Sequence, residues 1–170
     1  MKNIAYIDGQ NLHLATTKHP DSPWKVDLAR FRIYLERKYN VDRAYYYLGY
    51  VSDELDDMYE EIQAAGFILR FREHNPAMKS IKKGNVDTEI VFDVMRSLYK
   101  KDDFEKVLLV SGDGDYYRMV SFLIDEDRLK KLLFPDRKRA SSLYRNIDNK
   151  YHDDLSNKVL SHKIKMKRAP

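Results

Sequence analysis

Two aspartates lie almost side by side where an apolar run of the sequence ends. In LLVSGDGDYYRMV, residues 108–120, only Gly114 separates Asp113 from Asp115. Like charges at this spacing repel each other unless a cation lies between them, and Mg²⁺ prefers oxygen ligands of this kind. Carboxylates that hold such an ion can activate water and stabilise the transition state of phosphodiester hydrolysis. The pair therefore marks a candidate metal site.

The elements that must position these acids alternate along the chain. Short apolar or aromatic runs predict strands, and apolar residues spaced by three and four predict helices. We expect strands over 4–8, 43–51, 67–73, 106–113 and 129–135. We expect helices from Asn11 onward and over 27–39, 52–66, 86–99 and 116–128, with further helical segments over 140–147 and 151–160. This alternation predicts an α/β fold, a three-layer α/β/α sandwich with a mainly parallel sheet.

A parallel sheet would bring acids from distant segments to one edge. Ligands of open α/β sheets bind beyond the carboxyl ends of the strands, near a switch in strand order. Asp8 ends the first expected strand, Asp113 ends the fourth, and Asp115 follows one turn residue later. If those two strands are neighbours, three carboxylates converge at the same edge.

Helical geometry supplies a fourth acid. At about 100° per residue, one stripe of the helix over 86–99 is apolar and consists of Ile90, Val91, Val94, Met95 and Leu98. Asp87 falls in line with this stripe, whereas Glu89 points to the opposite face and Asp93 lies off its centre. An inward carboxylate costs several kcal/mol unless it is paired or hydrogen-bonded. Asp87 is therefore the acid that this helix directs inward.

Each acid also has a purely structural interpretation. Asp8 and Asp113 precede glycines and form common turn pairs, Asp115 could cap the next helix, and Asp87 could stabilise its own helix dipole. Taken one at a time, these explanations are the stronger ones. Taken together they are weaker, because four separate turns would all have to place acids at one edge.

Three segments resemble the signature segments of NYN domains, in the LabA-like branch of the PIN-like ribonucleases. These are YIDGQN (6–11), KKGNVDTEIVFDV (82–94) and VSGDGDY (110–116), and their order and spacing match over residues 2 to about 135. The resemblance implies a PIN-like fold and cleavage of RNA phosphodiesters that depends on Mg²⁺ or Mn²⁺, most often as an endonuclease. Carried over by motif, the catalytic and metal-binding residues would be Asp8, Asp87, Asp113 and Asp115.

The same motifs suggest supporting residues around the acids. The resemblance implies that Asn11 holds the first strand end through side-chain hydrogen bonds, although helix capping explains it equally well. Asp93 matches a recurrent acid of the family, and its place on the helix leaves it behind the site or in a salt bridge. Ser111 would order the turn or bond to one of the acids.

Basic and aromatic residues near these motifs are candidates to contact RNA. Lys82 and Lys83 directly precede the helix of Asp87, and a second basic segment over 136–145 contains Arg137, Lys138, Arg139 and Arg145. Contacts with phosphates would give RNA binding that weakens as salt rises. Tyr116 and Tyr117 could stack on unpaired bases, although one of the two should pack into the core.

Composition limits the remaining choices. The chain has 170 residues, a net charge of +4 and no cysteine, which excludes disulfides, thiolate metal sites and a cysteine nucleophile. We expect one domain over 1–160 and a basic, flexible tail over 161–170. No apolar run approaches the roughly 18 residues that span a bilayer, and the strand-like start is unlike a signal peptide, so we expect a cytoplasmic protein with no membrane partner. PIN-like folds often pair, which leaves a homodimer open.

Other classes of function have weaker support. The sequence lacks a GxxxxGK[ST] loop, a GxGxxG turn and a G-x-S-x-G elbow, and its five histidines lack metal-ligand spacing. An RNA-binding or regulatory module with little or no cleavage is the main alternative, because some NYN members act in that way. A phosphatase with Asp8 as nucleophile would want an acid at residue 10, where this chain has Gln10.

Overall fold

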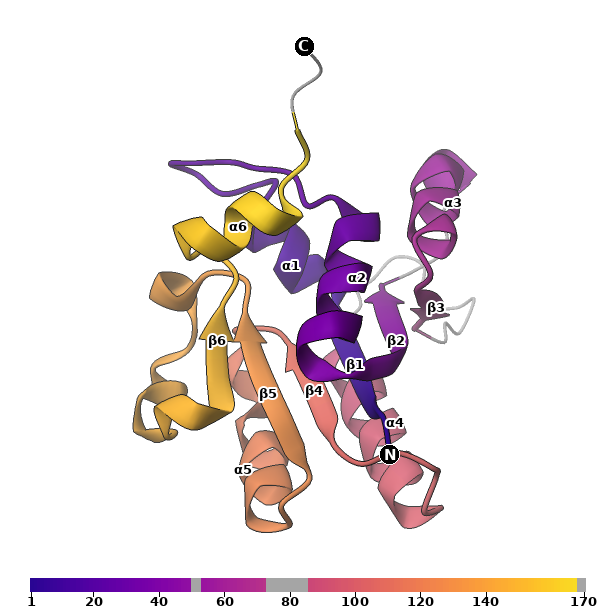
Figure 1. Cartoon of the computed structure of the whole chain (residues 1–170), viewed down its shortest axis with the longest axis vertical. Coiled ribbons are helices and arrows are strands. Elements are labelled where there is room, and N and C mark those ends of the chain that lie inside the picture. The colour runs from indigo at the N-terminus through magenta and orange to yellow at the C-terminus, as the bar shows by residue number, and fades with distance from the viewer. Residues whose placement is uncertain (50–52, 73–85, 168–170) are drawn as a thin grey trace, which may run out of the picture.

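A six-stranded sheet forms the middle layer of the molecule (Figure 1). The computed structural model describes residues 1–49, 53–72 and 86–167. Its strands are β1 Asn3–Asp8, β2 Val41–Leu48, β3 Ile68–Phe71, β4 Val107–Val110, β5 Leu129–Phe134 and β6 His152–Asp154. They lie in the order β3-β2-β1-β4-β5-β6, and each neighbouring pair in this order is parallel. The predicted α/β class with a mainly parallel sheet is confirmed.

Helices cover both faces of this sheet (Figure 1). One layer contains α1 Gly9–Ala15, α2 Leu28–Tyr39, α3 Asp56–Ala64 and α6 Lys158–Ile164, and the other contains α4 Asp87–Tyr99 and α5 Tyr117–Asp125. Short 3₁₀ turns connect them: η1 Asp53–Leu55, η3 Gly114–Tyr116, η4 Arg137–Arg139, η5 Ser142–Asn146 and η6 Asn149–Tyr151. The predicted three-layer α/β/α sandwich is therefore confirmed.

The central strands β1 and β4 contribute side chains to two hydrophobic cores, one on each face of the sheet. Successive side chains of a strand point to opposite faces, so Ile4 and Tyr6 of β1 pack with α4 and α5, while Ala5 and Ile7 pack on the side of α2. All residues of β1 and β4 are buried. Strands covered on both faces read as continuous apolar runs, which is why IAYI and VLLV lack a polar alternation.

The direction of strand progression reverses at β1. The chain runs outward from β1 through β2 to β3, and then returns to the other side of β1 to form β4, β5 and β6. β1 and β4 are therefore neighbours, with Ile7 paired to Val110 at their carboxyl ends. This is the switch point at which doubly wound sheets bind ligands.

The C-terminal third differs from the sequence prediction. The segment over 151–160 is not one helix, because His152–Asp154 pairs with Leu132–Phe134 as the edge strand β6. Sheet pairing overrides the local helical pattern there, and Asp154 then turns the chain by accepting bonds from the backbone N–H and hydroxyl of Ser156. The segment over 140–147 forms the 3₁₀ turn η5 rather than an α-helix.

The expected domain boundary at residue 160 falls inside α6. That helix continues to Ile164, whose side chain is fully buried, and Lys165 forms an antiparallel bridge with Val26. Residues 161–165 of the expected flexible tail are therefore part of the packed structure. Ser52, expected to cap the helix that became α3, lies outside the described residues. None of the helices that the structure describes is long and apolar enough to cross a membrane.

Candidate functional site

Asp8 occupies the buried centre of the edge where β1 and β4 end. It is the last residue of β1 and only 4% exposed. Its Oδ1 accepts the backbone N–H of Asn11 at 3.0 Å, which caps α1. Its Oδ2 accepts the Tyr116 hydroxyl at 3.0 Å and lies 3.5 Å from the Ser111 hydroxyl. The carboxylate is thus fixed by hydrogen bonds from two segments of the chain.

Burial and two other acids act on the ionisation of Asp8. Burial raises its pKa above the ordinary value, and the charges of Asp113 and Asp87 raise it further. The bonds from Asn11 and Tyr116 lower it and so compensate in part. Asp113, in the turn after β4, and Asp87, on α4, are therefore both within electrostatic range of Asp8 on β1.

Asp113 and Asp115 occupy the turn after β4. Asp113 is half-buried and caps η3, because its Oδ1 accepts the backbone N–H of Asp115 at 3.0 Å. Asp115 is exposed, and its charge joins that of Asp113 in raising the pKa of Tyr144. Asp115 thus lies at the outer side of this turn, whereas Asp113 faces the environment of Asp8.

Asp87 and Asp93 have different surroundings on α4. Asp87 is half-buried in the first turn, and its Oδ1 accepts the backbone N–H of Thr88 at 2.9 Å. Asp93 accepts the Tyr47 hydroxyl at 2.6 Å and forms an ion pair with Arg96 at 3.0 Å. The carboxylate of Asp93 is therefore used in packing α4 against β2.

The apolar stripe of α4 is narrower than the helical wheel predicted. Ile90 and Val94 are fully buried and Val91 and Leu98 partly buried, but Met95 is 37% exposed. The helix is rotated about its own axis so that Ile90 and Val94 face the sheet. Asp87 keeps its place at the N-terminal end of this buried face.

In the described part of the chain, no lysine, arginine or histidine forms an ion pair with Asp8, Asp113 or Asp115. Within the same residues, no group of three or more acidic or histidine side chains is close enough to hold a metal ion. The edge is a concentration of negative charge rather than a closed coordination shell.

Asn11 and Ser111 connect the two strand ends. The Asn11 Oδ1 accepts the backbone N–H of Gly112 at 2.9 Å, which ties the start of α1 to the turn after β4. Ser111 is fully buried, and its hydroxyl accepts the Asp113 backbone N–H at 3.1 Å while facing Asp8. Both side chains therefore order the acids, and Asp8, not Asn11, caps α1 through its side chain.

The structure corrects the base-stacking role predicted for Tyr116. Its ring is fully buried in the core under α5, and its hydroxyl is committed to Asp8. It cannot offer a face to a base. Tyr117, the other tyrosine of the pair, is only half-buried, and its ring centroid lies 6.0 Å from that of Tyr144.

The predicted basic contacts fall into two groups. Lys82 and Lys83 lie outside the described residues. Arg137, Lys138 and Arg139 form η4, which follows β5 at the same edge, and all three are exposed. The residues that follow η4 pack on the acidic turn, which is the segment over 111–115 that contains Asp113 and Asp115. The Ser141 backbone N–H donates to the Gly112 carbonyl at 2.9 Å, and the Tyr144 hydroxyl donates to the Asp113 carbonyl.

Sequence reasoning missed a buried acid at the end of β5. Asp136 is 6% exposed, caps η4 through the Lys138 N–H, and lies 3.1 Å from Nε2 of His19. Nδ1 of His19 accepts backbone N–H groups from Asp21 and Ser22, so Nε2 carries the proton that Asp136 accepts. The strand-end rule that selected Asp8 and Asp113 would have selected Asp136, but no local signal pairs it with His19.

Three comparisons place the chain among known proteins. The family model described as "NYN domain" matches residues 3–157. The low amplitude and bright protein LabA of Synechococcus elongatus is 25% identical over 158 residues, which cover 87% of this chain and 81% of that protein. The crystal structure of VPA0982 from Vibrio parahaemolyticus, a protein of unknown function, superposes with a TM-score of 0.73 at 18% identity, covering 97% of this chain and 96% of that one. The last likeness bears on the fold alone.

Proposed function

Because the chain belongs to the NYN domain family, whose fold is PIN-like and of the nuclease type, we propose that it is a metal-dependent ribonuclease. The reaction is hydrolysis of RNA phosphodiester bonds at the edge where β1 and β4 end. One observation carries the proposal. Asp8 is buried beside the charges of Asp113 and Asp87 at the switch point of the sheet, with no cation of the described residues paired to it.

The chemistry of these side chains suits a divalent cation. Carboxylate oxygens are the ligands of Mg²⁺ and Mn²⁺, and Mg²⁺ usually binds through one or two carboxylates and keeps several waters. An open set of acids therefore fits such an ion without a complete protein shell. Asp8 and Asp113 would hold it, with Asp87 contributing charge from α4 and Asp115 from the exposed side. When bound, the ion would supply an activated water and neutralise charge on the phosphate.

The other residues of the edge have positioning roles in this proposal. Asn11 and Ser111 fix the two strand ends, and Tyr116 holds the orientation of the Asp8 carboxylate. Asp93 supports α4 through Tyr47 and Arg96. Exposed Arg137, Lys138 and Arg139 would contact RNA phosphates, and Lys82 and Lys83 precede α4 in the sequence. Asp115 and the three cations of η4 are exposed, and we propose internal cleavage of an RNA strand that lies across this edge of the sheet.

Cleavage and metal binding can be tested separately. The test compares wild type, Asp113→Asn and the exposed control Asp125→Asn on single-stranded and structured RNA with Mg²⁺ or Mn²⁺. We expect cleavage by wild type and Asp125→Asn and its loss in Asp113→Asn. Independently, Mn²⁺ at about 100 times its Kd should stabilise wild type by about 2.7 kcal/mol, a shift of several degrees in melting temperature, but not Asp113→Asn. Inert wild type, or equal cleavage by Asp113→Asn, would refute the proposal.

The alternative is an RNA-binding or regulatory module with little or no cleavage. It is favoured by the spacing of the acids, since no three of the described ones lie close enough to hold an ion directly. It is also favoured by the hydrogen bonds that occupy both oxygens of Asp8. Such a module would bind RNA with a strong salt dependence and release no fragments. The same assay therefore separates the two functions.

A further inference from the structure

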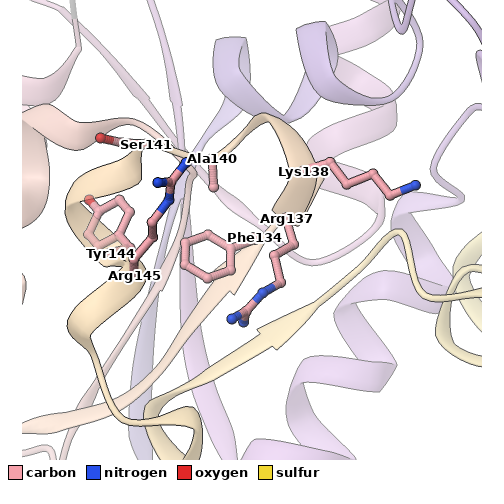
Figure 2. A pocket seen from close by; sticks show the side chains of 7 residues that line it. All are labelled: Phe134, Arg137, Lys138, Ala140, Ser141, Tyr144 and Arg145. Atoms are coloured by element: carbon pink, nitrogen blue, oxygen red, sulfur yellow. The ribbon is translucent and has the colours of Figure 1, made fainter.

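A small hollow lies beside the acidic turn at the carboxyl end of β5 (Figure 2). Its volume is about 190 Å³, and the side chains that shape it are Phe134, Arg137, Lys138, Ser141, Tyr144 and Arg145. Phe134 and Tyr144 are buried and their ring centroids are 5.5 Å apart, so they form the aromatic part of the lining. The cations around these rings are exposed.

Three cations line the hollow: Arg137, Lys138 and Arg145. In the part of the chain that the structure describes, no carboxylate forms an ion pair with Arg137, Lys138 or Arg145. The nearest acid in sequence, Asp136, is engaged with His19 and with the backbone of η4. An anion in the hollow would therefore meet three cations that no described carboxylate pairs, although the charges of Asp113 and Asp115 reach Tyr144 in its lining.

The Arg137 side chain contacts an aromatic ring and an imidazole. Its guanidinium lies 5.8 Å from the centroid of Phe134, and its Nη1 lies 2.5 Å from Nδ1 and 3.0 Å from Nε2 of His152. Burial and the neighbouring Arg137 hold the pKa of His152 below its usual range, so the imidazole is neutral and adds no repulsion. In Figure 2 the Phe134 ring lies between the Arg137 and Arg145 side chains, and Lys138 extends away from it. Arg137 and Arg145 are thus the two cations that flank the buried ring of Phe134.

The walls of the hollow contact the acidic turn directly. The Ser141 N–H donates to the Gly112 carbonyl at 2.9 Å, and the Tyr144 hydroxyl donates to the carbonyl of Asp113. A Cβ on Gly114 would lie 2.5 Å from the Ser141 hydroxyl oxygen, so the two segments touch because residue 114 is glycine. A group bound in the hollow is therefore next to the acids without displacing them.

We propose that this hollow binds one phosphate of the RNA strand, adjacent to the phosphate at the acids. This inference rests on the proposed function and adds a subsite to it. The hollow is smaller than the roughly 300–1,000 Å³ of pockets that enclose drug-sized ligands, so it takes a phosphate rather than a whole nucleotide. Planar guanidinium groups match phosphate oxygens in pairs, and Arg137 and Arg145 supply two of them, with the Ser141 hydroxyl as a further donor.

Binding of a single-stranded RNA to the full chain in EDTA tests the subsite without any cleavage. The test variant is Arg137→Gln/Arg145→Gln, and the matched control is Arg37→Gln/Lys163→Gln, which removes the same charge from a basic hollow between α2 and α6. We expect the test variant to bind about tenfold more weakly, the equivalent of about 1.4 kcal/mol, with a slope of log affinity against log salt reduced by about 0.7. The control should retain its affinity to within about threefold.

Replacing Arg137 could weaken the fold, because Arg137 packs on Phe134 and His152. The single variant Arg145→Gln controls for this effect, because Arg145 is exposed. It should lose part of the affinity with an unchanged melting temperature. Comparing RNAs with a 5′-phosphate, a 5′-hydroxyl and a 3′-phosphate identifies the source of the phosphate: a terminal one gives a preference for that end, and an internal one gives none.

Three outcomes would overturn the subsite: no RNA binding by wild type, full affinity of the test variant, or equal losses in test variant and control. The ribonuclease proposal fails independently. Hollow-dependent RNA binding without cleavage in Mg²⁺ or Mn²⁺ keeps the subsite and rejects the nuclease. Cleavage by wild type with unchanged RNA affinity of the test variant does the reverse.

Discussion

The Tyr116 hydroxyl donates a hydrogen bond to Oδ2 of Asp8 at 3.0 Å, and both residues are buried. This bond joins the end of β1 to the 3₁₀ turn that leads into α5. It lowers the pKa of Asp8, against the opposite effect of burial and of the neighbouring acids. Tyr116 therefore acts on the candidate site through Asp8 and not through contact with RNA.

Tyr116→Phe should raise the pKa of Asp8 further. The substitution removes the donor but keeps the ring that packs under α5, so the carboxylate loses a bond that favours its charged form. NMR titration of the Asp8 carboxyl carbon measures the change directly. Tyr117→Phe, at the neighbouring half-buried position, should leave the titration unchanged. Equal pKa values in wild type and Tyr116→Phe would contradict this assignment.

Asp8 should make the fold less stable as pH rises. Its pKa is raised in the folded state, so the native protein binds the proton more tightly than the unfolded chain. The resulting stabilisation is complete below the unfolded pKa and is lost as pH rises through the folded one. Asp8→Asn should therefore be more stable than wild type at pH 7, by about 1.4 kcal/mol for each unit by which the pKa is raised.

Urea unfolding of both proteins between pH 4 and pH 8 in EDTA checks this expectation. The stability difference between Asp8→Asn and wild type should grow with pH. The exposed control Asp125→Asn should follow wild type throughout. A difference in stability that is independent of pH, or a less stable Asp8→Asn at pH 7, would show that ionisation of Asp8 does not destabilise the folded protein.

Asn11→Ala should destabilise the fold although it removes only a small polar side chain. The Asn11 Oδ1 accepts the N–H of Gly112, which is buried, so the substitution leaves that donor without its partner. An unsatisfied buried donor costs about 1–3 kcal/mol. Asn146→Ala, an exposed asparagine of η5, should change the free energy of unfolding by less than about 0.5 kcal/mol. Chemical denaturation measures both, and equal effects would remove Asn11 from its connecting role.

Asp87 and Asp93 should separate activity from stability. Asp93→Asn weakens the bonds to Tyr47 and Arg96, so we expect a loss of about 1–2 kcal/mol in stability, with cleavage kept. Asp87→Asn removes a charge that acts on Asp8, so we expect a fall in cleavage on the order of 100-fold. Cleavage rates and melting temperatures of the two variants decide the matter. The reverse pattern would make Asp93 the functional acid.

Local patterns were enough to predict the layers of the fold and to select candidate acids for one edge of the sheet. Strand and helix periods gave the α/β/α order, and the carboxyl ends of two apolar runs pointed to Asp8 and Asp113. The helical wheel distinguished Asp87 from Asp93, although it misplaced Met95, which is 37% exposed. Each of these inferences depends only on residues within one or two turns of the chain. The α/β layers are confirmed, whereas the functional roles of the acids stay predictions.

The C-terminal segments were harder to predict for the same reason. Nothing local in YHDDLSNKVL indicates that His152–Asp154 adds an edge strand to β5, because the pairing is decided by residues 20 positions away (Leu132 opposite His152). Likewise, two adjacent tyrosines look alike in the sequence. Only the packing of α5 on the sheet buries Tyr116 and turns its hydroxyl toward Asp8.

The sequence by itself determined which residues carry negative charge and where each lies on its own element. The tertiary structure alone decided that β1 and β4 are neighbours, that Asn11 reaches Gly112, and that the segment after β5 forms a basic hollow against the acidic turn. The physical reason is the range of the interactions. Periodicity reports which face of an element is apolar, whereas strand order and hydrogen bonds between residues about a hundred positions apart depend on how those faces pack together.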